Sequence, residues 1–228
     1  MLVFNEIVQK LQFPKTSVYR MVGSLTDMGL LQKEDGKYRL GLTFLQFGLL
    51  VSERLDVRKV ALPLMYSLRD EVGEAVNLIV RDRDEAIYVE KVDTEQPVRV
   101  YTQTGRRAPM YAGACPRILL AFLPFQEQEQ YVGNVELKPL AKGTITDRAV
   151  LRSVLSESRI KGYSISHSEL ENDTSAVAAP IFDHRGMVIA GLSIAGPTTR
   201  FDEERVWTLV ERVVFYAHEC STRLGYNA

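Results

Sequence analysis

Three closely spaced breaks in the first 43 residues most constrain how this chain can fold. Pro14 suits the first turn of a helix, because its missing N–H needs no partner there. Gly29 suits a helix C-terminus, and Asp35-Gly36 suits the tight turn of a hairpin. Apolar residues recur at helical spacing on both sides of Pro14, and short strand-like runs flank Asp35-Gly36. The sequence therefore predicts two short helices and a β-hairpin, the pattern of a winged helix-turn-helix.

The second of these helices has two chemically different faces. Val18, Met21, Val22 and Leu25 lie on one face, which is expected to pack inward. The opposite face carries hydrogen-bond donors, the chemistry needed for phosphate contacts and base reading in a major groove. These candidate DNA-binding residues are Lys15, Thr16, Ser17, Tyr19 and Arg20, together with Lys37 and Arg39 in the hairpin. A solvated surface without a function is the alternative interpretation of both groups.

Charge is distributed unevenly along the chain. Residues 1–43 hold six basic and four acidic residues, a net charge of +2, whereas the remainder carries −3. The overall charge of −1 alone would argue weakly against nucleic-acid binding. The asymmetry is modest and can arise by chance, so it agrees with a DNA-binding N-terminus without establishing one.

Residues 61–228 are predicted to form one α+β domain around a largely antiparallel sheet. Helical apolar spacing predicts a linker helix over 44–60, which 55–56 can interrupt, and a further helix to about Glu71. Pro63 marks the true start of that helix or a kink in it. The expected strands cover 75–80, 86–92, 98–103, 163–166, 176–182 and 187–194, and later helices are expected over 116–123 and 146–161 and from Asp202 onward.

Composition excludes several classes of protein. With 228 residues, 46% apolar and 25% charged, the chain is long and apolar enough to bury a real core. Its longest apolar runs are too short to cross a bilayer, and its first ten residues do not resemble a signal peptide. Two cysteines and three histidines provide neither a disulfide scaffold nor a metal-ligand spacing. A cytoplasmic protein with no metal and no cofactor is expected.

Several blocks occur in the order found in one family. Lys15–Arg20, Gly36–Gly41 and Ile87–Val92 are similar to the recognition helix, the wing and a sensor-domain strand of the IclR family of bacterial transcription regulators. Further similar blocks are 105–109, 119–123, 178–183 and 192–197. Each block alone is weak, but their collinear succession covers nearly the whole chain, which thus resembles an IclR-family regulator.

The resemblance implies an architecture and a set of partners. It implies a winged helix-turn-helix over 1–43, a linker helix over 44–60 and a GAF-like effector-binding domain over 61–228, with an antiparallel sheet flanked by helices. It also implies an operator in double-stranded DNA, a small-molecule effector, dimers through the N-terminal region and dimers of dimers through the sensor domains. None of this oligomerisation follows from composition or periodicity.

The chain departs from the family pattern at two places. Relatives usually carry a further helix of about twenty residues before the position of Leu2, which covers the apolar backs of the next two helices. Without it, Ile7, Leu11, Val18 and Val22 are expected to be partly wet or covered by a partner chain. A misplaced start, a truncated sequence and a degenerate DNA-binding domain all stay open. The second departure is Pro116-Arg117, where many relatives have Gly-Lys.

A turn of small residues before the helix at Pro116 is a candidate effector site. Small side chains let a ligand approach the backbone, and a helix N-terminus attracts an anion, so a carboxylate is the expected occupant. In relatives the pocket is completed near the penultimate strand of the sensor. The candidate effector-binding residues are Tyr111, Gly113, Ala114, Cys115, Arg117, Ser166, Thr174, Ser175 and Ala176. The alternative is a tight turn packed on the sheet.

The leading hypothesis is a transcriptional regulator whose operator affinity changes when a small organic acid binds the sensor domain. A stand-alone metabolite-binding module that has lost DNA binding is the second hypothesis. An enzyme with Cys115 as nucleophile is the third, and it lacks an assignable base. Cys115 can also be a redox sensor, because a helix start lowers a thiol pKa, or simply a small packing residue.

Overall fold

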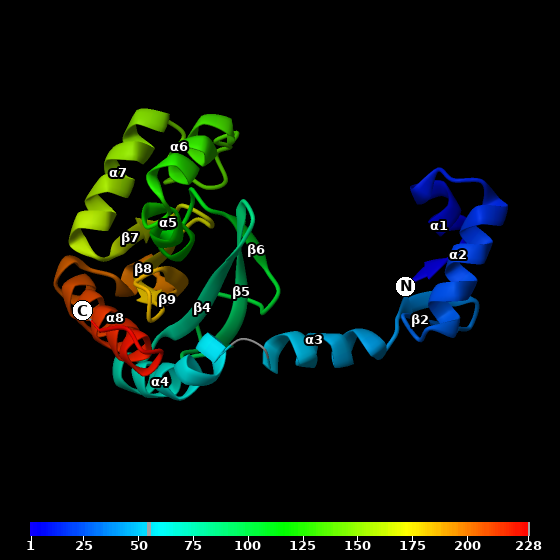
Figure 1. Ribbon diagram of the computed structural model, residues 1–228, viewed down its shortest axis with the longest axis horizontal. Coiled ribbons are helices and arrows are strands. Elements are labelled where there is room, and N and C mark those ends of the chain that lie inside the picture. Colours follow the sequence, from blue (N-terminus) through cyan, green and yellow to red (C-terminus); the bar gives the residue numbers. More distant parts are fainter. Residues whose placement is uncertain (54–55, 228) are drawn as a thin grey trace. The chain divides into compact units, whose positions relative to one another are not determined.

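The computed structural model describes residues 1–53 and 56–227 and divides into two compact units, Met1–Leu55 and Asp56–Ala228. The N-terminal unit begins with the short strand β1 (Leu2–Val3), the helices α1 (Phe4–Leu11) and α2 (Lys15–Asp27), and the strands β2 (Leu31–Glu34) and β3 (Lys37–Leu40). Helix α3 (Thr43–Glu53) follows. Figure 1 shows this order along the chain.

The predicted helices and hairpin of the N-terminal unit are confirmed. The hairpin turn uses Asp35 and Gly36 at φ 48° and 74°, a left-handed conformation that aspartate tolerates and glycine favours. One strand was not predicted, because β1 is only two residues long. It pairs with β3 through Leu2 and Tyr38 and makes a three-stranded sheet of order β1-β3-β2.

The inward face of α2 is narrower than its apolar pattern predicts. Val18 and Val22 are buried within the single chain, so the expectation that they would be partly wet or covered by a partner chain is wrong for these two residues. Met21 and Leu25 are 49% and 37% exposed, although the spacing predicted them inward. Leu11 on α1 is also exposed, at 46%, as expected. A strip of apolar surface therefore remains uncovered on this unit.

Helix α3 presents apolar side chains to solvent along its length. Phe44, Phe47, Leu50 and Val51 are each between 46% and 59% exposed. The interruption predicted at 55–56 falls partly on residue 55, which lies outside the described residues, as does residue 54. Helix α4 (Asp56–Val72) begins the second unit and runs through Pro63, so Pro63 does not mark its start.

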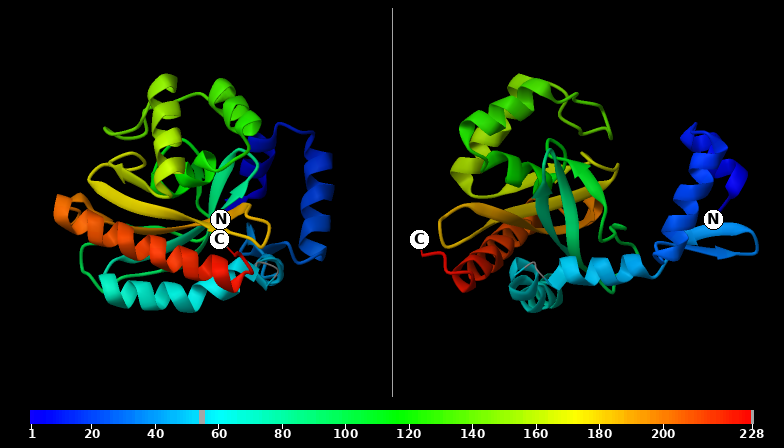
Figure 2. Two further views of the ribbon diagram at one scale, coloured as in Figure 1. Left: turned by 60° about the vertical axis from the view of Figure 1, so that its left-hand side comes forward. Right: turned by 45° about the vertical axis from the view of Figure 1, so that its right-hand side comes forward.

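The C-terminal unit is built on a six-stranded antiparallel sheet of order β6-β5-β4-β9-β8-β7. Its strands are β4 (Ala75–Asp82), β5 (Glu85–Val92), β6 (Arg107–Pro109), β7 (Ser164–His167), β8 (Thr174–Phe182) and β9 (Val188–Pro197). Its later helices are α5 (Ala114–Ala121), α6 (Phe125–Asn134), α7 (Arg148–Lys161) and α8 (Glu203–Arg223), with a 3-10 turn at Thr198–Arg200. Helices α4 and α8 cover one face of the sheet, and α5, α6 and α7 lie on the other (Figure 2).

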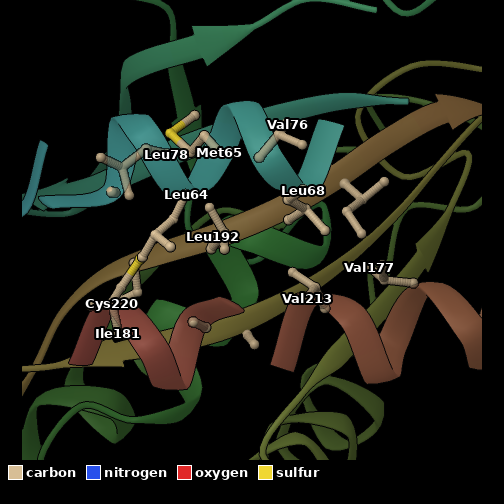
Figure 3. Close-up of a cluster of buried hydrophobic side chains, with 14 of the residues drawn as sticks. Leu64, Met65, Leu68, Val76, Leu78, Val177, Ile181, Leu192, Val213 and Cys220 are labelled. Atoms are coloured by element: carbon tan, nitrogen blue, oxygen red, sulfur yellow. The ribbon is translucent and has the colours of Figure 1, made fainter. Parts of the chain in front are cut away.

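The main core of this unit lies between the sheet and the pair α4 and α8. Figure 3 shows apolar side chains from both helices meeting those of the central strands. The labelled residues are Leu64, Met65, Leu68, Val76, Leu78, Val177, Ile181, Leu192, Val213 and Cys220. Cys220 is fully buried there. A second core beneath α5, α6 and α7 includes Ile118, Leu120 and Leu155.

Most elements of the C-terminal unit match the sequence patterns. Asp147 caps α7 by accepting hydrogen bonds from the N–H groups of Ala149 and Val150 at 2.7 and 2.9 Å, and Gly162 ends that helix at φ 76°. Helix α6 was missed. The prediction of a strand over 98–103 is wrong. Val100 and Thr102 point inward, but this segment pairs with no strand and borders a pocket instead.

Candidate functional site

The predicted DNA-binding side chains lie on the exposed surface of α2. Lys15, Thr16, Tyr19 and Arg20 are exposed, and Ser17 is half-buried. Tyr19 is 71% exposed, and its ring makes a T-shaped contact with the ring of Phe4, with 6.0 Å between the centroids. Helix α1 thus supports one side of the face without covering its donors.

An open hollow runs along the same helix. Ser17 and Arg20 line it, and so do three residues that were not predicted, Met21, Ser24 and Leu25. Ser24 adds a hydroxyl donor one turn beyond Arg20. Its position at helical spacing from Ser17 and Arg20 is the signal that could have found it.

The two hairpin residues differ in their surroundings. The Arg39 guanidinium lies 3.0 Å from a Glu34 carboxylate oxygen, and its Nε donates to Gln32 at 3.1 Å. Lys37 is exposed and forms no ion pair within the part of the chain that the structure describes. Lys37 is therefore the freer of the two to meet a phosphate group.

The C-terminal unit contains a pocket at the start of α5. It has a cavity volume of about 50 Å³ and gathers residues from β4, β5, β7, β8 and β9 and from the segment before β6. Seven of the nine predicted effector-binding residues line it, although they come from three separate stretches of sequence. They are Gly113, Ala114, Cys115, Ser166, Thr174, Ser175 and Ala176.

The helix N-terminus in this pocket already has protein acceptors. The N–H of Gly113 donates to the Glu169 carboxylate at 2.9 Å, and the N–H of Ala114 donates to the Ser166 hydroxyl at 2.9 Å. Pro116, in the same turn, has no N–H. The carboxylate expected at the positive end of this helix is thus supplied by Glu169 of the chain itself.

Arg117 and Tyr111 lie outside the pocket lining. Arg117 is 2% exposed and forms an ion pair with Glu169, and it also donates to the carbonyl of Ile165. The Tyr111 hydroxyl donates to the carbonyl of Lys138 at 3.0 Å. Both side chains are buried and therefore support the walls of the pocket from outside.

The thiol of Cys115 lines the pocket but is not activated. Burial raises its pKa to about 12, and a hydrogen bond with Ser193 opposes that shift only in part. The thiol is therefore protonated at neutral pH. Neither the redox-sensor hypothesis nor the nucleophile hypothesis gains support from this environment.

Other lining residues were not predicted. Asn77 and Ser193 face each other on β4 and β9, both are buried, and the Asn77 Oδ1 has no hydrogen-bond partner within the described ranges. Polar residues inside otherwise apolar strands are a sequence signal that could have found them. Arg106, Glu169 and Glu171 carry the pocket's charges. Glu169 and Glu171 lie in a connecting segment without a recognisable pattern, and Arg106 lies in the 105–109 block, which resembles the family but did not mark it as a pocket residue.

Within residues 1–53 and 56–227, no helix is long and apolar enough to span a membrane. No group of three or more histidine, cysteine, aspartate or glutamate side chains among these residues is placed to hold a metal ion.

The chain matches two family models in succession. The IclR helix-turn-helix domain matches residues 2–35, and the bacterial transcriptional regulator IclR C-terminal domain matches residues 50–222. The second match covers well over half of the chain, so this protein belongs to the IclR family. It is a DNA-binding transcriptional regulator with a winged helix-turn-helix and a C-terminal effector domain.

Individual relatives resemble it over nearly their full length. The HTH-type transcriptional regulator KipR of Bacillus subtilis (strain 168) is 51% identical over 227 residues, which are 99% of this chain and 91% of that protein. The crystal structure of Thermotoga maritima IclR has a TM-score of 0.82 and 32% identity, covering 99% of this chain and 92% of that one. The crystal structure of an IclR homolog from Microbacterium hydrocarbonoxydans, complexed with 4-hydroxybenzoate, has a TM-score of 0.85 and 28% identity. The match covers 97% of this chain and 90% of that one.

Proposed function

We propose that α2 reads operator DNA, that the hairpin contacts its backbone, and that a small organic acid in the C-terminal pocket changes operator affinity. The exposed donors Lys15, Thr16, Tyr19 and Arg20, with Ser17 in the hollow beside them, carry the DNA part of the proposal. Lys37 contributes a phosphate contact, and Arg39 contributes less because Glu34 already pairs with it. The protein acts where DNA is, in the cytoplasm.

The observation that carries the effector part is the pocket itself. Seven predicted residues converge on it from distant parts of the sequence, and its lining includes the buried Asn77, whose Oδ1 has no hydrogen-bond partner among the described residues. The structure of the Microbacterium homolog contains 4-hydroxybenzoate, a small carboxylate. This supports a small organic acid as the class of effector for the present chain.

The protein is proposed to act as a dimer or a dimer of dimers. Phe44, Phe47, Leu50 and Val51 leave an apolar stripe on α3 exposed, and such a stripe is stabilised by a second copy of the helix. Effector binding then changes the relative stability of two arrangements of the oligomer, which differ in operator affinity. A monomer at micromolar concentration in sedimentation would contradict this part.

Selection and titration test the function together. A random-sequence duplex library, selected with the full chain, provides the operator, and fluorescence anisotropy at fixed salt gives its affinity. A panel of small organic acids is then screened for a change in that affinity. We expect at least one acid to change it several-fold in the wild type.

A pocket-filling variant identifies the responding site. Ala176→Leu fills the pocket from β8 and should bind the operator normally while losing the response to the acid. Ala149→Leu, the same change at an exposed position on α7, should keep both. Gly113→Leu is unsuitable, because Gly113 has φ +85° and an added Cβ would lie 2.7 Å from a Leu170 methyl carbon.

The alternative function makes the opposite prediction. A stand-alone metabolite-binding module would bind acids in the same pocket but select no sequence from the library. The match of residues 2–35 to the helix-turn-helix family and the exposed donors on α2 both favour the DNA-binding function.

A further inference from the structure

The charges around the pocket leave one cation available to an anionic effector. Of the described lining residues, Arg106 carries the positive charge, and Glu169 and Glu171 carry negative charges. Glu169 is committed to the N–H of Gly113 and to the buried guanidinium of Arg117. The N–H groups of Gly113 and Ala114 at this helix N-terminus already donate to Glu169 and Ser166, so the charge of an acid needs a partner elsewhere.

Arg106 is held by Glu171 on the solvent side of the pocket. A guanidinium nitrogen of Arg106 lies 2.7 Å from a carboxylate oxygen of Glu171, and the two side chains are 29% and 44% exposed. The pair joins the segment before β6 to the turn between β7 and β8. A partly exposed ion pair of this kind changes an equilibrium constant by no more than about fivefold, so a ligand can displace it.

The two partners are anchored to different degrees. The carbonyl of Arg106 accepts from the N–H of Tyr88 at 3.0 Å, the neighbouring Gly105 N–H donates to the Tyr88 carbonyl at 2.7 Å, and the guanidinium lies over the Tyr88 ring at 5.9 Å. The main chain of Glu171 is also held, because its carbonyl accepts from the Thr174 hydroxyl at 2.8 Å, but its carboxylate has Arg106 as its one partner in the described part of the chain. Of the two charged groups, the guanidinium is the more firmly held, because it also contacts the Tyr88 ring.

We propose that Arg106 binds the carboxylate of the effector and that Glu171 occupies this position until the effector replaces it. This inference rests on the proposed function, namely that the pocket takes an organic acid, and it names the residue that selects for the acid. The bidentate geometry of a guanidinium favours a planar carboxylate over a neutral group of the same shape. Neutral analogues of the effector are accordingly excluded by charge and not by size.

Acetate is the probe for this proposal, and neutral acetamide, which has the same shape, is the matched ligand control. Isothermal titration or NMR of the full chain measures binding of each to the wild type, Arg106→Gln and Glu171→Gln. Arg107→Gln is the control variant, because Arg107 pairs with Asp82 and Glu85 and lies outside the pocket lining. Circular dichroism and sedimentation confirm that each variant keeps the fold and oligomeric state.

Opposite effects of the two substitutions are the expected result. Arg106→Gln should weaken acetate binding at least tenfold, Glu171→Gln should tighten it several-fold by removing the competitor, and Arg107→Gln should leave it unchanged. Acetamide should bind no better to Glu171→Gln than to the wild type. Unchanged acetate binding in Arg106→Gln would overturn the proposal, as would no binding by Glu171→Gln. The variants could bind acetate as expected while no acid changes operator affinity. That result would contradict the proposed function but would still identify Arg106 as the carboxylate-binding residue.

Discussion

The two units of this protein differ in how much apolar surface they bury and in where their candidate sites lie. In the described part of the N-terminal unit, Val18 and Val22 are the buried large apolar side chains. The C-terminal unit buries two extensive clusters on opposite faces of its sheet. The proposed DNA-binding residues of α2 share a single helix surface, whereas the proposed effector pocket is assembled from residues between 77 and 195.

This difference teaches how sensitive each site is to its surroundings. A face on one helix depends on local spacing, so its residues can be replaced with little effect on the rest of the fold. A pocket built from five strands and a helix N-terminus depends on long-range contacts, and buried residues outside its lining can still destroy it. The comparison predicts that substitutions at the site in the C-terminal unit lower the free energy of unfolding more than substitutions at the site in the N-terminal unit.

The largest expected effect is at the buried ion pair beneath the pocket. Arg117→Met leaves the Glu169 carboxylate, 7% exposed, without its cation. We expect the free energy of unfolding to decrease by about 3–5 kcal/mol, measured by urea denaturation. Arg39→Met in the N-terminal unit breaks the exposed pair with Glu34 and should cost less than about 1 kcal/mol. Equal losses in the two variants would contradict the comparison.

A second prediction concerns the DNA-binding face. Arg20→Ala should weaken binding to the selected operator by about 1–3 kcal/mol and leave binding to random duplex almost unchanged, because a base contact is lost. Lys37→Ala should weaken binding to all sequences alike, because it removes a phosphate contact. Salt-titrated anisotropy separates these outcomes. Losses independent of sequence in both variants would remove Arg20 from base reading.

Local signals made the N-terminal unit the easier one to predict. Pro14, Gly29 and Asp35-Gly36 set the helix and hairpin boundaries, since each acts through its own backbone preferences. Exposure of Met21 and Leu25 could not be predicted, because it depends on which neighbours are available to cover them. The two-residue strand β1 is too short to carry an alternating pattern.

The pocket shows what the sequence could not provide. The turn of small residues pointed to Gly113 and the family resemblance to Ser166 and Ala176, and the fold brings the three together. Arg117 and Glu169 are 52 residues apart, and no spacing rule links a cation in a helix to a carboxylate in a turn. Arg106 follows a segment whose alternation predicted a strand. The inward residues of that segment, Val100 and Thr102, border the pocket, and the segment does not pair with a neighbouring strand.

Alkaline pH should destabilise the C-terminal unit through its buried thiols. Burial raises the pKa of Cys115 and of Cys220 from 9.0 to about 12, so the unfolded chain loses these protons at lower pH than the folded one. Stability is thus fully present below pH 9 and decreases between pH 9 and 12, by up to about 1.4 kcal/mol per pH unit for each thiol. Urea denaturation at pH 9 and pH 10 should show this decrease, and Cys115→Ala should reduce it. An identical pH dependence in wild type and variant would argue against the buried thiol.

A smaller effect is expected at the capped helix α7. Asp147→Ala removes the acceptor for the N–H groups of Ala149 and Val150 and should lower the free energy of unfolding by about 1 kcal/mol. Asp84→Ala, in the exposed turn between β4 and β5, is the matched control and should change it by less than about 0.5 kcal/mol. The start of helix α2 has no side-chain cap, so no equivalent substitution exists there.

Thermodynamic reciprocity tests most directly whether the two units act on each other. If an acid in the pocket changes operator affinity by some factor, the operator must change the affinity for that acid by the same factor. Titrating the full chain with the responding acid, with and without saturating operator, should give dissociation constants that differ by about 5- to 150-fold, equal to the factor seen in DNA binding. Ala176→Leu should show no coupling. An affinity for the acid that is identical with and without operator would contradict the account.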